Sequence, residues 1–143
     1  MTQLLIVAAV TLVALGVGAY MQSKAPDAPS TPENHTTPDQ LDRSDFRQPE
    51  SDWLVVVFSS ATCKTCAKVW TSAQLLASKD VAVQNVEVSS DAELHERYNI
   101  TAVPSVVIAD KEGVARGSFL GPPSSSELWA KLAELRGLDE GPS

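Results

Sequence analysis

The chain of 143 residues is poor in cysteine, in histidine and in positive charge. Its 11 lysines and arginines stand against 18 acidic residues, which gives a formal net charge of −7. Without clusters of basic residues the chain cannot neutralise many phosphates, so we expect no nucleic-acid partner. Two cysteines can form one disulfide at most, which excludes a small scaffold held together by several bridges.

Charge is also absent from Leu4 to Met21, a stretch of apolar and small residues. This is about the minimum length for a helix that crosses a bilayer, roughly 17 to 25 residues. We therefore predict a transmembrane anchor at residues 1–21, with the membrane as a partner through residues 4–21. One alternative is a signal peptide cleaved near Val17–Gly18–Ala19, although no basic residue precedes the apolar run. The other is a buried core helix, although the run has no polar face.

Residues 22–40 are rich in proline, serine, threonine and aspartate and contain almost no large apolar side chain. Such a segment cannot bury a core, and we predict an extended linker that includes His35. The folded domain is then expected at residues 41–137, followed by a tail at residues 138–143.

Apolar patterns predict the elements of this domain. Trp53–Ser59 is a continuous apolar run, typical of a strand buried on both faces. From Cys63 onward, apolar or small residues recur at the spacing of one face of an amphipathic helix, namely at Cys66, Val69, Trp70, Ala73 and Leu76. The further elements expected are an edge strand or turn at 41–46, a strand at 81–88, a strand at 105–109, a turn at 110–113 and a strand at 114–120.

Two Ser-x-x-Glu segments predict helix starts by the capping-box pattern. Ser90–Glu93 opens a short helix through Tyr98, with His95 on its surface. Ser124–Glu127 opens a final helix that ends near Gly137 and has Leu128, Leu132 and Leu135 on one face. The first two strands are joined by a helix and should be parallel, and the last two should form an antiparallel hairpin. The result is a mixed sheet with helices on its faces.

The two cysteines, Cys63 and Cys66, lie where the strand at 53–59 leads into the helix. At a helix N-terminus, unpaired backbone N–H groups and the helix dipole favour a thiolate at Cys63, and Lys64 adds a positive charge nearby. Cys66 falls one turn into the helix on its apolar face, so we expect it to be more buried. A zinc site would need two more ligands, but His35 lies in the linker and His95 on a helix surface, so we predict no metal site.

These features together resemble the thioredoxin family. The resemblance rests on the order of the elements, on the Cys-x-x-Cys at 63–66 between strand and helix, and on Ala-Val-Pro-Ser at 102–105 before the hairpin. Gly121 after the last strand also matches, and the similarity covers about residues 41–136. It implies an α/β fold, a thioredoxin-like mixed sheet flanked by helices, here with an N-terminal transmembrane helix.

The resemblance also implies a role for each site residue. Cys63 would be the nucleophile and Cys66 the resolving thiol, with Thr62 and Lys64 as supporting neighbours.

A cis Val103–Pro104 peptide bond would lie beside the cysteine pair. The backbone of Val103 would then be free to pair with an extended substrate segment.

The chain departs from the family pattern at four places. Thr62 replaces a tryptophan before the first cysteine, and Lys64–Thr65 replace Gly-Pro between the cysteines. Val57 stands where the family has a buried acidic residue that assists the resolving thiol, and Thr71 replaces a helix proline. The similarity is therefore to a thioredoxin-like protein other than a general disulfide reductase.

We predict a membrane-tethered thiol–disulfide oxidoreductase that exchanges with protein thiols and disulfides, takes electrons from an unidentified donor and needs no cofactor. Anchored thioredoxin-like proteins often face outside the cytoplasm, whereas Lys24 argues weakly for the inside. We therefore expect a single-pass membrane protein with an extracytoplasmic domain.

Two alternative functions remain for the domain that carries the cysteine pair. One is a Cu(I) carrier, because residues 61–66 also resemble the Thr-Cys-x-x-Cys loop of copper chaperones, and the other is a redox-silent interaction module.

Overall fold

The computed structural model describes the backbone of residues 1–23 and 36–139 and the side chains of residues 1–16 and 36–138. The chain divides into two compact units, residues 1–33 and residues 34–143. The predicted linker at 22–40 and tail at 138–143 fall mainly on residues 24–35 and 140–143, which lie outside the described residues.

The first unit contains helix α1 (Thr2–Ser23). No helix among the described residues combines the length and the apolar character needed to span a bilayer. This corrects the prediction of a transmembrane anchor at residues 1–21, and with it the predicted single-pass membrane location.

The second unit is built on a four-stranded mixed sheet with the strand order β2-β1-β3-β4. Strand β1 (Trp53–Ser59) is parallel to β2 (Val81–Glu87) and antiparallel to β3 (Ser105–Ala109), and β3 forms an antiparallel hairpin with β4 (Ala115–Leu120). All seven residues of β1 are buried, as the continuous apolar run predicts for a central strand. The predicted mixed sheet is confirmed.

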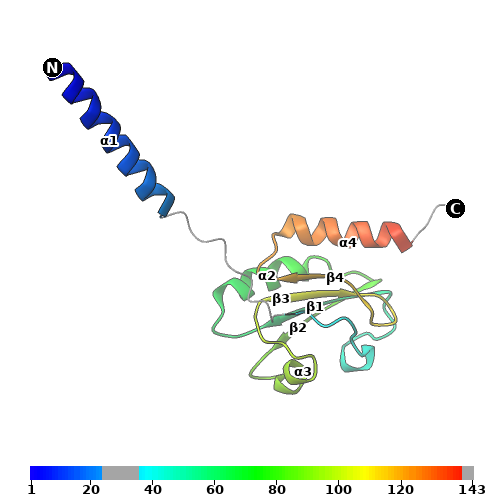
Figure 1. The fold of residues 1–143 in the computed structure, drawn as a ribbon. Coiled ribbons are helices and arrows are strands. Elements are labelled where there is room, and N and C mark those ends of the chain that lie inside the picture. The colour runs from blue at the N-terminus through cyan, green and yellow to red at the C-terminus, as the bar shows by residue number, and fades with distance from the viewer. Residues whose placement is uncertain (24–35, 140–143) are drawn as a thin grey trace. The chain divides into compact units, whose positions relative to one another are not determined.

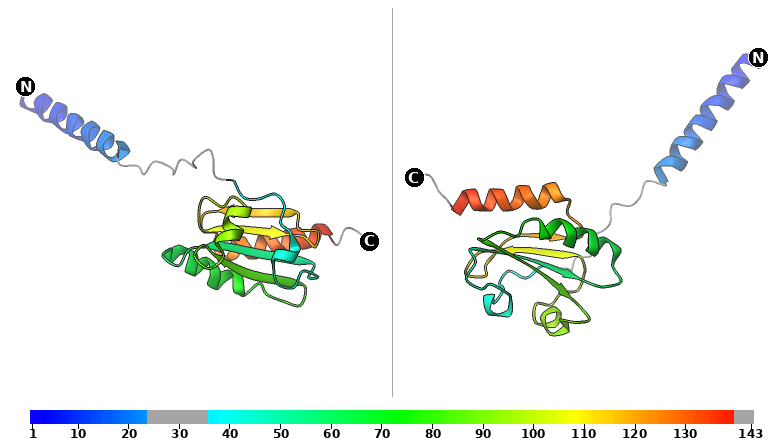
Figure 2. Two further views of the ribbon diagram at one scale, coloured as in Figure 1. Left: turned by 90° about the horizontal axis from the view of Figure 1, so that it is seen from below. Right: turned by 180° about the vertical axis from the view of Figure 1, so that it is seen from behind.

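Helices cover both faces of this sheet (Figures 1 and 2). On one face lie α2 (Lys64–Gln74) and α4 (Ser125–Asp139), and we call it the α2/α4 face. On the other lie α3 (Ala92–Arg97) and a short 3-10 helix, η1 (Arg43–Asp45), and we call it the α3 face. Each face has its own core.

A cluster of buried apolar residues forms the core of the α2/α4 face. Alternate residues of β1 pack there against the predicted helix stripes, and the cluster comprises Trp53, Val55, Val57, Val69, Ala73, Leu76, Val81, Val106, Ile108, Leu128, Leu132 and Leu135. The final helix begins as expected. Ser124 donates its backbone N–H to the Glu127 carboxylate at 2.7 Å, and the Glu127 N–H donates to Ser124 Oγ at 3.2 Å. This reciprocal pair is the predicted capping box.

The second predicted capping box does not form. Asp91 is the N-cap of α3 and makes no side-chain capping bond. The backbone N–H of Ser90 donates instead to the carboxylate of Glu87, at 3.2 Å. A carboxylate at the end of β2 thus takes the donor that the local pattern assigned to Glu93.

His95 is buried, which corrects its predicted position on a helix surface. Its Nε2 lies 2.9 Å from the carbonyl oxygen of Val86, and because a carbonyl only accepts, Nε2 carries the proton and donates. The ring also packs edge-on against Phe58, with 5.5 Å between the ring centres. His95 therefore joins α3 to β2 and packs against β1 on the α3 face of the sheet.

The segment before β1 is held by a buried arginine. Arg43 Nη1 donates to the carbonyls of Ser51 and Asp110, both at 2.9 Å, and Nη2 donates to the carbonyl of Gln48 at 3.1 Å. Burial lowers the pKa of the Arg43 guanidinium, although nearby carboxylates, Asp110 foremost, act in the opposite direction. Arg43 therefore joins η1 to two turns, at 48–51 and at 110–113, at the end of the sheet that lies opposite the cysteines.

The predicted edge strand or turn at 41–46 contains η1 and is preceded by a single bridge between Gln40 and Val114. The Leu41 N–H donates to the Gly113 carbonyl at 2.8 Å. Gly113 has φ +84°, and a Cβ there would lie 2.0 Å from the Leu41 carbonyl oxygen. Only glycine fits this close backbone approach.

Tyr98 links η1 to α3. Its hydroxyl donates to Asp45 Oδ2 at 2.5 Å and accepts the backbone N–H of Asp42 at 3.0 Å. Arg97 pairs with the other oxygen of Asp45. Burial, followed by the hydrogen bond to Asp45, raises the pKa of Tyr98 to about 12.

Candidate active site

The two cysteines lie at the carboxyl end of β1. The chain leaves β1 after Ser59, makes a three-residue loop at 60–62 and enters α2 with Cys63 as its N-cap. Cys63 and Cys66 are joined by a disulfide, with 5.3 Å between their Cα atoms. Cys63 Sγ also accepts the backbone N–H of Cys66 at 3.2 Å. The sulfur thus occupies the position of a capping oxygen, where the first N–H groups of the helix favour negative charge.

The two sulfur-bearing residues differ in access. Cys66 is 2 % exposed and packs on the inner side of α2, whereas Cys63 is half-buried. The sequence-based expectation that Cys66 is the more buried of the two is confirmed. An incoming thiolate can therefore reach Cys63 more easily than Cys66.

The neighbours Thr62 and Lys64 are exposed. Thr62 belongs to a local turn, because its N–H approaches Ser60 Oγ at 3.4 Å and its hydroxyl lies 3.1 Å from the same atom. Lys64 takes part in no ion pair among the described residues, so a carboxylate does not neutralise its charge there. Both are predicted supporting residues, and their positions beside Cys63 are compatible with that role.

The Val103–Pro104 peptide bond is cis, as the family resemblance implied. Pro104 is buried and immediately precedes Ser105, which is the register partner of Phe58 in β1. The proline and the cysteine pair therefore come together at one end of the sheet. In the described part of the chain Val103 makes no hydrogen bond, whereas Pro104 accepts the N–H of Gly121 at 2.9 Å.

Val57 lies in the apolar core beneath α2 and is fully buried. Polar groups near the pair lie instead on the adjacent strand, β2. Ser59 Oγ donates to Asn85 Oδ1 at 2.7 Å, and the Glu87 carboxylate accepts the Ala61 N–H at 2.9 Å. Both β2 residues line a pocket of about 190 Å³ beside the disulfide, together with Ser59, Ser60, Ala61, Cys63, Cys66, Ala67 and Trp70.

Sequence reasoning missed Asn85 and Glu87. The available signal was the parallel pairing of β1 and β2, since parallel strands bring their carboxyl ends to the same edge of a sheet. In the register of this sheet Val57 lies beside Asn85 and Ser59 beside Glu87. Polar residues in the second half of β2 could therefore have been assigned to the neighbourhood of the cysteines.

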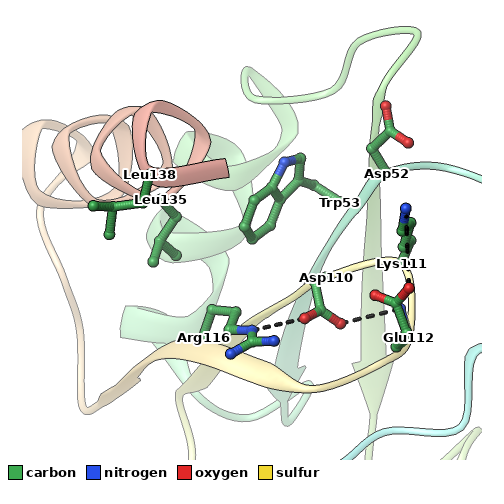
Figure 3. A pocket seen from close by; sticks show the side chains of 8 residues that line it. All are labelled: Asp52, Trp53, Asp110, Lys111, Glu112, Arg116, Leu135 and Leu138. Atoms are coloured by element: carbon green, nitrogen blue, oxygen red, sulfur yellow. Dashed lines mark hydrogen bonds and ion pairs between the residues drawn. The ribbon is translucent and has the colours of Figure 1, made fainter. Parts of the chain in front are cut away.

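A second pocket, of about 340 Å³, lies at the amino end of β1, away from the cysteines (Figure 3). Trp53 and the α4 residues Leu135 and Leu138 form its apolar side. Its polar side carries paired charges, with Arg116 Nε 2.7 Å from Asp110 Oδ2. It contains neither cysteine and has no evident part in disulfide chemistry.

Comparisons with known proteins agree with this geometry. The glutaredoxin family model matches residues 55–113, which include both cysteines and Pro104. None of the curated protein sequences gives a significant match.

Solved structures match the fold. A designed protein is 30 % identical with a TM-score of 0.56, covering 74 % of this chain and 95 % of its own. A thioredoxin variant from Halobacterium salinarum is 21 % identical with a TM-score of 0.57, covering 69 % and 93 %. The germline-specific thioredoxin Deadhead from Drosophila melanogaster is 24 % identical with a TM-score of 0.53, covering 61 % and 84 %. With a mixed sheet, a disulfide of Cys-x-x-Cys spacing at a helix N-terminus and a cis-proline beside it, the chain belongs to the thioredoxin-like family.

Proposed function

We propose that this chain is a thiol–disulfide oxidoreductase that exchanges with protein substrates through Cys63 and Cys66. The observation that carries the proposal is the asymmetry of the pair. Cys63 is accessible at the N-cap of α2, and Cys66 is buried behind it. The sulfur of Cys63 can react with a substrate, and the sulfur of Cys66, one helical turn away, can then form the intramolecular disulfide.

In the reducing direction, the Cys63 thiolate attacks one sulfur of a substrate disulfide. A Cys63–substrate bond forms, the substrate S–S bond breaks and the first substrate thiolate leaves. The Cys66 thiolate then attacks Cys63 Sγ, which forms the Cys63–Cys66 disulfide and releases the second substrate thiolate. Two electrons pass from the pair to the substrate, and a donor dithiol must return them. The oxidising direction reverses each step.

The surroundings support particular roles. The helix N-terminus and the charge of Lys64 stabilise the Cys63 thiolate. The backbone of Val103, beside the cis-proline, is available to pair with an extended substrate segment. Thr62 borders Cys63 on the loop side and limits the shape of the substrate that reaches the sulfur.

Two assays test the proposal, reduction of insulin with a chemical dithiol as donor and oxidation of a reduced dithiol peptide by the disulfide form. Cys63→Ser should abolish both activities. Cys66→Ser should retain the first step and accumulate a mixed disulfide that mass spectrometry detects. If the unmodified protein fails both assays while its cysteines are accessible to alkylation, the proposal is wrong, and Cu(I) titration then tests the alternative use of the pair.

The direction of electron flow follows from the reduction potential, measured by equilibration with glutathione. A value of about −270 mV indicates a reductant and one of about −120 mV an oxidant.

A further inference from the structure

The loop that carries Cys63 is fixed to the sheet by one carboxylate. Within residues 60–62 the hydrogen bonds are local, from Cys63 N–H to the Ser60 carbonyl at 3.1 Å and between the Ser60 and Thr62 hydroxyls. Among the described residues, one hydrogen bond joins this loop to another element, from the Ala61 N–H to Glu87 Oε1 at 2.9 Å.

Glu87 is itself held firmly. Its second oxygen, Oε2, accepts the backbone N–H groups of Ser89 at 2.9 Å and Ser90 at 3.2 Å. The backbone of the same region is tied to β1, because the Val88 N–H donates to the Ser59 carbonyl at 3.0 Å. The carboxylate therefore bridges the loop that follows β1 and the loop that follows β2.

The Glu87 carboxylate is ionised, which strengthens its hydrogen bonds to the two loops. Three backbone N–H donors, that of Ala61 foremost, hold the pKa of Glu87 below its usual range. The side chain is therefore ionised at neutral pH, and hydrogen bonds to an ionised acceptor are about twice as strong as those between neutral groups. Glu87 also lines the same pocket as Cys63 and Cys66.

We propose that Glu87 is a positioning residue for the reaction of Cys63. By holding the Ala61 N–H it fixes the loop at 60–62, and the loop holds Cys63 at the N-cap of α2, in reach of both Cys66 and the substrate. The inference rests on the proposed function. Its chemical basis is that a misplaced nucleophile loses rate steeply, by up to a hundredfold for about 1 Å.

Two conservative variants separate the position of the carboxylate from its charge. Glu87→Gln removes the charge but keeps an oxygen at the same reach, which can still accept the Ala61 N–H. Glu87→Asp keeps the charge but shortens the side chain by one methylene, so that it no longer bridges the two loops. Glu93→Ala is the matched control, since Glu93 is exposed and makes no hydrogen bond or ion pair among the described residues.

The readouts are the rate constant for alkylation of reduced Cys63 by iodoacetamide at neutral pH and the hydrogen exchange of the Ala61 amide. We expect Glu87→Asp to slow alkylation by about tenfold, because a sulfur displaced from the N-cap of α2 loses the N–H groups that favour its thiolate, and to speed exchange at Ala61. We expect Glu87→Gln to stay within about threefold of the unmodified protein, and Glu93→Ala to match it.

Equal alkylation rates in Glu87→Asp and the unmodified protein would overturn the inference. The inference would also be overturned if Glu87→Gln slowed the alkylation of Cys63 while Glu87→Asp left it unchanged. The reactivity of Cys63 would then depend on the charge of residue 87 and not on its hydrogen bond to Ala61. Both readouts concern the cysteine itself. A protein that is alkylated normally at Cys63 but exchanges with no disulfide would instead count against the proposed function alone.

Discussion

The two faces of the sheet reach stability by different means. The core cluster of the α2/α4 face consists of aliphatic side chains together with Trp53 as its one aromatic ring. The α3 face combines an apolar cluster with the buried Arg43 and His95 and the half-buried Tyr98, each of which binds backbone or carboxylate oxygens of another segment. The face that carries the reactive helix is thus held mainly by apolar packing, and the other by apolar packing together with specific hydrogen bonds.

This difference predicts how each face responds to mutation. Aliphatic packing loses free energy in proportion to the cavity that a truncation leaves. A polar link loses its hydrogen bonds and leaves partners unsatisfied. Four substitutions, three of them paired with a control variant, test the comparison in order of expected effect.

Leu128→Ala should be the most destabilising, because Leu128 is fully buried in the core of the α2/α4 face. We expect a loss of about 2–5 kcal/mol in the free energy of unfolding, measured by urea denaturation. Leu138 is the matched control on the same helix, since it is 72 % exposed. Leu138→Ala should change the free energy by less than about 0.5 kcal/mol. Equal losses at the two positions would contradict the packing of α4 described above.

Arg43→Ala should remove about 2 kcal/mol, because three carbonyl oxygens lose a charged donor in a buried setting. Arg116 offers a contrast. It also contacts Asp110, but its own side chain is exposed and pairs with the carboxylate. Arg116→Ala should cost less than about 1 kcal/mol in the same urea experiment. If the exposed arginine proved the more important, the polar links of the α3 face would be dispensable.

Tyr98→Phe should cost about 1.5 kcal/mol, because the phenol loses its bond to the charged Asp45. An alkaline absorbance titration should show a tyrosinate step near 12 that the variant lacks. The pKa of Tyr98 is raised in the folded state, so the contribution of the neutral phenol is complete below the ordinary tyrosine value of about 10. It is lost as the pH rises through about 12. No tyrosinate step near 12 in the unmodified protein would argue against this link between η1 and α3.

Ser124→Ala should cost about 1 kcal/mol through loss of the capping box that begins α4. Ser90→Ala should cost less than about 0.5 kcal/mol, because alanine retains the N–H that Glu87 accepts and loses only two exposed, long hydroxyl bonds, to the Glu87 carbonyl at 3.4 Å and to the Asp91 carboxylate at 3.2 Å. The thermal unfolding midpoints of the two variants, measured under the same conditions, give the difference. The N–H of Ser124 lowers the pKa of Glu127, so the stabilisation by this carboxylate is present at neutral pH and lost on acidification through the lowered value. If Ser90→Ala lost more free energy of unfolding than Ser124→Ala, the result would support the capping box that the sequence predicted for α3.

The same contrast explains what sequence patterns could predict. The stripe from Cys66 to Leu76 and the leucines of α4 are local regularities, and they correctly gave the α2/α4 face and its helices. The parallel and antiparallel pairings followed from connection lengths. The family resemblance supplied the cis bond before Pro104, for which local sequence carries little signal.

The features that were missed depend on partners distant in sequence. His95 looks like a surface residue on a polar helix, and its burial follows from its hydrogen bond to the Val86 carbonyl and its packing against Phe58. Ser90–Glu93 fits the capping pattern, but Glu87 competes for the Ser90 N–H. Glu87 and Asn85 join the candidate site through the register of β1 and β2, which a single sequence leaves open.

The capping role of Cys63 connects chemistry with folding. In the disulfide form Sγ already accepts the Cys66 N–H at the start of α2, and in the reduced form the same N–H would face a thiolate. Reduction and unfolding are legs of one thermodynamic cycle, so the reduction potential equals that of an unstructured dithiol shifted by the stability difference between the two forms. Each 1.4 kcal/mol by which the reduced form is the more stable raises the potential by about 30 mV. Two unfolding curves, one for each redox form, would therefore report whether α2 makes this pair an oxidant or a reductant.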